Sequence, residues 1–212
     1  MKYRFDVRDI TRIAVFAAII AVLGLPGAIP LVGGVPITAQ TLGVMLAGVV
    51  LGPWRAAAAV TVFELLVFAG LPLLSGGYGG VGVFVGPTAG YLIGWIPGAF
   101  VIGAIVRADI RPPHVWRIVV GCVVGGIALV YALGIPVTAL VLGLPLGPTA
   151  LSSLAFVPGD LIKVIITTAV ALALYKAYPR AFRPNGVTTV VREGQASASK
   201  DNAEQATTST SA

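Results

Sequence analysis

Charged residues are scarce in this chain. Asp, Glu, Lys and Arg make up only 10% of its 212 residues, whereas hydrophobic residues make up 57%. A soluble globular domain carries about 25% charged residues, so this composition excludes a soluble domain. Apolar runs of spanning length indicate helices in a bilayer. The fold class we predict is therefore an all-α integral membrane protein.

Cysteine and histidine are nearly absent as well. The chain holds one of each, Cys122 and His114, which excludes both a disulfide framework and a zinc cluster of Cys and His ligands. The phosphate-binding pattern G-x-x-x-x-G-K-[ST] is missing, so the chain does not hydrolyse ATP by that motif. The apolar runs carry no Ser/His pair and no acidic metal-binding cluster. We therefore expect a protein that is not an enzyme, with no catalytic residue, no metal and no cofactor.

Six apolar runs dominate the sequence. A helix needs about 20 apolar residues to cross the hydrocarbon core, and the second run is the shortest of the six. We predict six transmembrane helices in a domain of residues 1–185. The remaining residues, 186–212, are rich in Ser, Thr and Ala and predict a disordered cytoplasmic tail. The six runs cover residues 13–29, 38–52, 56–72, 84–106, 116–142 and 152–178.

The basic residues alternate with the predicted helices. Lys and Arg precede the first run, separate the second from the third and the fourth from the fifth, and follow the sixth. The other three loops, residues 25–37, 71–83 and 143–151, contain no charged residue. By the positive-inside rule both termini are cytoplasmic and the uncharged loops face outward. The net charge of +6 is thus explained by topology in a cell membrane, and we expect no nucleic-acid partner.

Once the flanks of the apolar runs are set aside, three charged residues lie inside the runs: Glu64, Asp160 and Lys163. Each costs roughly 2.5 to 3.5 kcal/mol at the bilayer centre. Asp160 and Lys163 are three apart, so they share one helix face, either as a self-contained ion pair or as a ligand site. We favour a ligand site because Pro158 and Gly159 precede the acid, and a broken helix offers free N–H groups to a substrate. We interpret Glu64 as structural rather than as a proton carrier.

Other polar residues are predicted at the same depth, toward the outer side. They are Thr38, Gln40, Thr88 and Tyr91. Taken singly, each is commonly a cap or a helix-packing contact. Their convergence beside Asp160 favours a substrate site near the extracellular face. The glycine-rich segment of residues 70–80 is either a lid over that site or a flexible connector.

Small residues mark the first helix. Ala14 and Ala18, and likewise Ala17 and Ala21, are four residues apart. This spacing allows another helix to approach closely within lipid. The partner helix belongs either to this chain or to another protein.

Several motifs together resemble one known family. In order and spacing they cover about residues 10 to 178, and they resemble the BioY family, the biotin-binding S components of energy-coupling factor (ECF) transporters. The matching segments are PITAQTLGV at 36–44, LAG at 46–48, LGP at 51–53, GLP at 70–72, GPTAGYLIG at 86–94 and PGDLIK at 158–163.

The resemblance implies a six-helix S-component fold that captures biotin from outside and docks on a transmembrane coupling subunit driven by two cytoplasmic ATPases. The small face of the first helix would be the docking face. Asp160 would accept hydrogen bonds from the ureido N–H groups of biotin, and Lys163 would donate either to the ureido carbonyl or to the valerate carboxylate, unless biotin binds in the swapped orientation. The sequence also leaves open an S component for a different vitamin, or a solitary biotin transporter without a dedicated coupling module.

Overall fold

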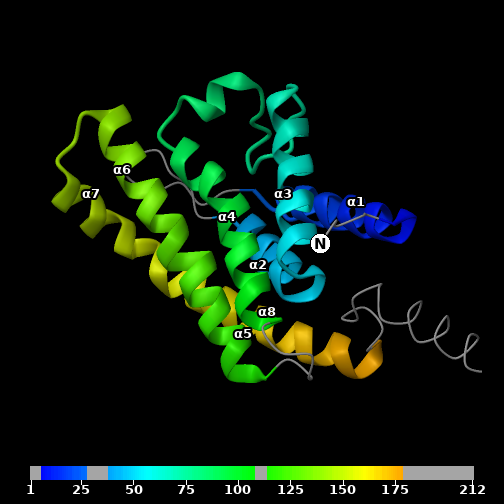
Figure 1. The fold of residues 1–212 in the computed structure, drawn as a ribbon. Coiled ribbons are helices and arrows are strands. Elements are labelled where there is room, and N and C mark those ends of the chain that lie inside the picture. The colour runs from blue at the N-terminus through cyan, green and yellow to red at the C-terminus, as the bar shows by residue number, and fades with distance from the viewer. Residues whose placement is uncertain (1–5, 28–37, 108–113, 179–212) are drawn as a thin grey trace, which may run out of the picture. The chain divides into compact units, whose positions relative to one another are not determined.

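The structure is a computed structural model that describes residues 6–27, 38–107 and 114–178. In these residues the chain is helical, so the predicted all-α class is confirmed. The predicted tail, residues 186–212, lies outside the described residues. The elements are α1 (Val7–Val22), α2 (Gln40–Leu51), α3 (Pro53–Phe68), η1 (Val81–Phe84), α4 (Ala89–Val106), α5 (Val115–Gly121), η2 (Cys122–Leu129), α6 (Val130–Leu142), α7 (Leu146–Ser153), η3 (Leu154–Phe156) and α8 (Val157–Ala177) (Figure 1).

Three helical segments of the described chain are long and apolar enough to cross a membrane. They are Ala89–Val106, the continuous α5–η2–α6 segment Val115–Leu142, and the α7–η3–α8 segment Leu146–Ala177. The shorter helix α2 is apolar too. Six spans and the orientation of the termini therefore stay predictions.

Two helices begin earlier than the sequence predicts. α1 begins at Val7 rather than at residue 13, because Asp6 caps it. The Asp6 side chain accepts a hydrogen bond from the N–H of Val7 at 2.7 Å, and the Asp9 side chain accepts one from the N–H of Asp6 at 3.4 Å. This reciprocal arrangement satisfies N–H groups that a helix start leaves open. α3 begins at Pro53, a residue suited to the first position of a helix.

The predicted outer loop of residues 143–151 is wrong in part, because α7 occupies most of it. Gly143 has a φ of 65° and ends α6 in the left-handed conformation, which glycine adopts readily at the end of a helix. Pro145 then has extended backbone, and α7 begins directly after it. Pro148 lies in the first turn of α7, where a missing N–H costs nothing.

Helix α4 is the central element of the bundle (Figure 1). It packs against α2, α3, α5, η2 and α6. A Cβ on Gly98 of α4 would lie 2.7 Å from the carbonyl oxygen of Gly125 in η2, and one on Gly125 would lie 2.6 Å from the carbonyl oxygen of Gly98. The two backbones therefore touch, which only glycine permits at both positions.

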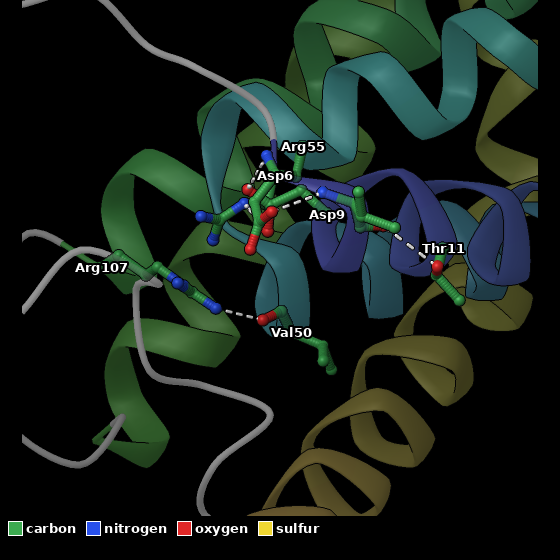
Figure 2. Close-up of polar contacts among 7 residues, drawn as sticks. Asp6, Asp9, Thr11, Val50, Arg55 and Arg107 are labelled. Carbon is green, nitrogen blue, oxygen red and sulfur yellow. Dashed lines mark hydrogen bonds and ion pairs between the residues drawn. The ribbon is translucent and has the colours of Figure 1, made fainter. Parts of the chain in front are cut away.

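Two arginines join four helices in pairs, α3 to α1 and α4 to α2, where α1 and α3 begin and where α2 and α4 end. Figure 2 shows Arg55 directed at Asp9, with 2.9 Å between Nε and Oδ1. Arg107 donates through Nη2 to the carbonyl oxygen of Val50. Burial, followed by the positive charges of Arg55 and Arg12, lowers the pKa of Arg107 to about 10, so its guanidinium stays charged at neutral pH. This cluster fixes the C-terminal end of α2, while the candidate site lies at its N-terminal end.

Candidate ligand-binding site

Asp160 and Lys163 form the predicted ion pair. Nζ of Lys163 lies 2.9 Å from Oδ1 of Asp160, and the side chains of Lys163 and Asp160 are 13% and 9% exposed. Both residues lie near the beginning of α8, which starts at Val157 with Pro158 in its first turn. The helical conformation runs without a break from Leu146 to Ala177, so the break predicted at Pro158 and Gly159 is wrong. The ammonium of Lys163 is the charge that neutralises the carboxylate.

Two further helices contribute a hydroxyl each to the pair. The hydroxyl of Tyr131 in α6 donates to Oδ2 of Asp160 at 2.5 Å. Nζ of Lys163 also donates to Oγ1 of Thr41 in α2, at 2.7 Å. Each carboxylate oxygen of Asp160 thus has its own donor, and two of the three N–H groups of Lys163 are used. Because charge-assisted hydrogen bonds are short and directional, α2, α6 and α8 hold both charged groups in fixed positions.

Three aromatic rings pack together beside this polar cluster, and one of them is Tyr131. The ring centroid of Tyr91 lies 6.0 Å from that of Tyr131 and 6.3 Å from that of Phe156, and Tyr131 lies 6.5 Å from Phe156. All three pairs meet edge to face, the arrangement that ring quadrupoles favour. The hydroxyl of Tyr91 lies 3.2 Å from Oγ of Ser153 in α7. The arrangement combines apolar ring faces with a small number of oriented polar groups, as ligand sites do.

The predicted site residues fall into three groups: those at the charged pair, two half-buried threonines, and Gln40. Asp160, Lys163 and Tyr91 come together, joined by the ring of Tyr131. Thr38 is half-buried just before α2, and Thr88 is half-buried at the start of α4.

Gln40 belongs to a different network. It is 1% exposed, and its amide is bonded to backbone atoms of α1 and of the segment after α3. It is nevertheless the neighbour of Thr41, which contacts Lys163.

Sequence reasoning missed Tyr131, Thr41, Phe156 and Ser153. One signal was available for Tyr131, because it is the only aromatic residue between residues 118 and 142. A lone tyrosine in an aliphatic run needs a partner for its hydroxyl when it is buried. No comparable signal marks the other three.

The structure separates the two alanine pairs of α1. Ala17 is 4% exposed and packs in the core of the bundle, and Ala21 is partly buried against that core. Ala14 and Ala18 are exposed, on the strip of the helix surface next to that of Ala17 and Ala21. The face of Ala17 and Ala21 is thus covered by this chain, and only Ala14 and Ala18 are accessible to another protein.

Glu64 lies apart from the cluster, on α3. It is 6% exposed, and its Oε1 has no hydrogen-bond partner in the described part of the chain. The structural role of Glu64 stays a prediction.

Comparison with known proteins identifies the family. The BioY family matches residues 1–180. The biotin transporter BioY of Rhodobacter capsulatus is 50% identical over 189 residues, which cover 84% of this chain and 99% of the relative. The biotin transporter BioY of Rhizobium etli is 46% identical over 182 residues, covering 81% of this chain and 95% of the relative.

A solved structure agrees with these relatives. The crystal structure of the S-component for biotin from an ECF-type ABC transporter is 32% identical to this chain and superimposes with a TM-score of 0.78. The match covers 86% of this chain and 100% of that structure. The family match, the sequence identities and the similar fold agree, and the chain belongs to the BioY family.

Proposed function

We propose that this chain takes up biotin across the cell membrane as the substrate-binding S component of an ECF-type ABC transporter. The observation that carries the proposal is the buried Asp160–Lys163 pair, held by Tyr131 and Thr41. Support comes from the similar biotin transporters and from the similar S-component for biotin. A buried ion pair is expensive in a membrane protein, and a ligand with complementary polar groups gives it a purpose.

The chemistry of biotin suits this cluster. The ureido ring of biotin offers two N–H donors and one carbonyl acceptor, and its bicyclic body is apolar. Asp160 accepts from the ureido N–H groups, while Lys163 donates through its third N–H group to the ureido carbonyl or to the valerate carboxylate. The rings of Tyr91, Tyr131 and Phe156 pack against the apolar body. Thr38 and Thr88 complete the polar contacts in this proposal.

The same proposal includes a topology and partners. Six helices cross the membrane, both termini are cytoplasmic, and the site opens toward the extracellular side, as the distribution of charge favours. A transmembrane coupling subunit and two cytoplasmic ATPases supply the energy. The exposed face of α1 at Ala14 and Ala18 docks on the coupling subunit, because small residues allow helices to approach closely in lipid.

Titration of the purified chain with labelled biotin tests this function. Removing one member of a desolvated charged pair costs roughly 2 to 5 kcal/mol, because the other charge is left unpaired. Asp160→Asn and Lys163→Met should therefore weaken biotin binding by more than tenfold. The matched controls are Asp6→Asn and Lys176→Met, which make the same chemical changes at exposed positions; both should bind like the wild type.

Near-native affinity in the folded Asp160 and Lys163 variants would refute the site. Absence of biotin binding by the wild type would refute the function. Competition between labelled biotin and other vitamins separates biotin from a different cargo. Copurification with the coupling subunit and the ATPases separates an ECF transporter from a solitary one.

A further inference from the structure

Gln40 connects two segments that are far apart in the sequence. Its Nε2 donates to the carbonyl oxygen of Ile20 at 3.2 Å and to that of Leu73 at 3.0 Å. Its Oε1 accepts from the N–H of Ser75 at 3.1 Å and from the Ser75 hydroxyl at 3.4 Å. Both N–H groups and both acceptor positions of the amide are thus occupied. The residue is 1% exposed, so these bonds do not compete with water.

The 70–80 loop has a defined conformation around this contact. Leu74 and Tyr78 pair across the turn, and Gly76 and Gly77 between them have φ values of 87° and 77°. Ser75, whose N–H and hydroxyl contact Gln40, is 3% exposed. The loop is therefore attached to the bundle through its middle.

The end of α1 fits closely against this loop. A Cβ on Gly24 would lie 2.7 Å from the carbonyl oxygen of Leu73 and 3.0 Å from Nε2 of Gln40. Side chains essentially never approach that closely, so glycine is required at this position. The loop, the end of α1 and the start of α2 consequently meet at the Gln40 amide.

The next residue of α2 reaches the ion pair. Oγ1 of Thr41 accepts from Nζ of Lys163 at 2.7 Å, and Lys163 contacts Asp160 at 2.9 Å. Gln40 and Thr41 are the first two residues of α2. A single helical turn therefore holds the loop on one side and the charged pair on the other.

We propose that Gln40 is a positioning residue that fixes the 70–80 loop to the outer ends of α1 and α2 and so slows the release of ligand from the Asp160–Lys163 site. This inference rests on the proposed function, because it assumes that biotin binds at that pair. A ligand that contacts Lys163 restricts the first turn of α2 through the bond of Lys163 to Thr41. Gln40, in the same turn, joins that turn to the loop.

Two measurements on the full chain in detergent test this role. Hydrogen exchange of peptides from residues 70–80 is compared with and without biotin, and the association and dissociation rates of labelled biotin are measured in parallel. Gln40→Met keeps the length of the side chain and removes all four contacts. Ser75→Ala is the matched control, because it removes only the 3.4 Å contact and keeps the N–H donor of Ser75.

In the wild type, biotin should slow exchange in the loop peptides. In Gln40→Met this protection should disappear and dissociation should become about tenfold faster, while the association rate stays within about twofold. Ser75→Ala should resemble the wild type in both measurements. Gln40→Asn, which keeps the amide on a shorter side chain, should give intermediate protection, and it carries the test if Gln40→Met does not fold.

A residue that only stabilises the fold would change the melting temperature without changing the dependence of loop exchange on biotin. The inference is overturned if biotin leaves loop exchange unchanged in the wild type. It is also overturned if both Gln40 variants release biotin at the wild-type rate. Failure of the wild type to bind biotin at all would instead overturn the proposed function, and this inference with it.

Discussion

Tyr131→Phe is the substitution that tests the arrangement of the site most cleanly. It removes one hydroxyl and keeps the ring that packs against Tyr91 and Phe156. The lost contact is the 2.5 Å hydrogen bond to Oδ2 of Asp160. Lys163 still holds the other carboxylate oxygen, so the charge stays paired while the orientation of the carboxylate is released.

The substitution should have two separate effects, one on the stability of the chain and one on its affinity for biotin. A hydrogen bond to a charged group contributes about 1.5 to 3 kcal/mol to stability, so the melting temperature of the ligand-free chain should fall by several degrees. The free energy of biotin binding should change by less than the stability. In the variant, the only added cost of binding is that the Asp160 side chain must be reoriented. Ordering one side chain costs about 0.5 to 1.5 kcal/mol, so Kd should rise about two- to thirteenfold.

Thermal unfolding without biotin and titration with labelled biotin measure the two effects separately. Tyr178→Phe is the matched control, because Tyr178 is 54% exposed at the end of α8. It should leave both quantities unchanged. If Tyr131→Phe matched Tyr178→Phe in melting temperature and in Kd, the claim that Tyr131 orients the carboxylate would be refuted.

Three further substitutions address the neighbouring elements. Thr41→Val removes the acceptor for Lys163 and should weaken biotin binding about tenfold, whereas Thr41→Ser should bind normally; equal affinities in a titration would contradict this. Gly134→Ala places a Cβ 2.5 Å from the ring of Tyr91 and should cost about 1 to 3 kcal/mol by overpacking, seen as a lower melting temperature; an unchanged value would contradict the packing. Ala14→Leu, on the exposed face of α1, should leave biotin affinity unchanged and reduce copurification with the coupling subunit, and full copurification would argue against docking there.

The ion pair is the part of the site that sequence reasoning predicted. Asp160 and Lys163 are three residues apart in one helix, and local periodicity alone brings them together. Tyr131 was missed for a physical reason. The backbone is π-helical over residues 122–129, which changes the rotation per residue. The face to which Tyr131 turns therefore does not follow from the pattern before it.

Gln40 shows a second limit of prediction from the sequence. Its residue type and its place at the start of a helix predict a polar contact, and the sequence favoured a ligand as the partner. Its partners in the structure are backbone groups of Ile20, Leu73 and Ser75. Backbone donors and acceptors exist at every residue, so no sequence pattern indicates which of them a side chain will reach across 33 or 35 positions.

The helix boundaries were predicted less well than the existence of the helices. Charged residues suggested that the first helix starts after Arg12, but the Asp6 cap extends it to Val7. The segment of residues 143–151, which lies between two apolar runs, was predicted as a loop, although Pro148 is compatible with the first turn of α7. In both cases the residues at the helix start determine where the helix begins, and the composition of the segment does not.

An experimental structure of the chain with biotin bound tests the central claim most directly. The account predicts the ureido ring beside Asp160, with a ureido N–H group within hydrogen-bond distance of a carboxylate oxygen, and Lys163 in contact with an oxygen of the ligand. Biotin bound elsewhere, with the Asp160–Lys163 pair out of its reach, would contradict the account.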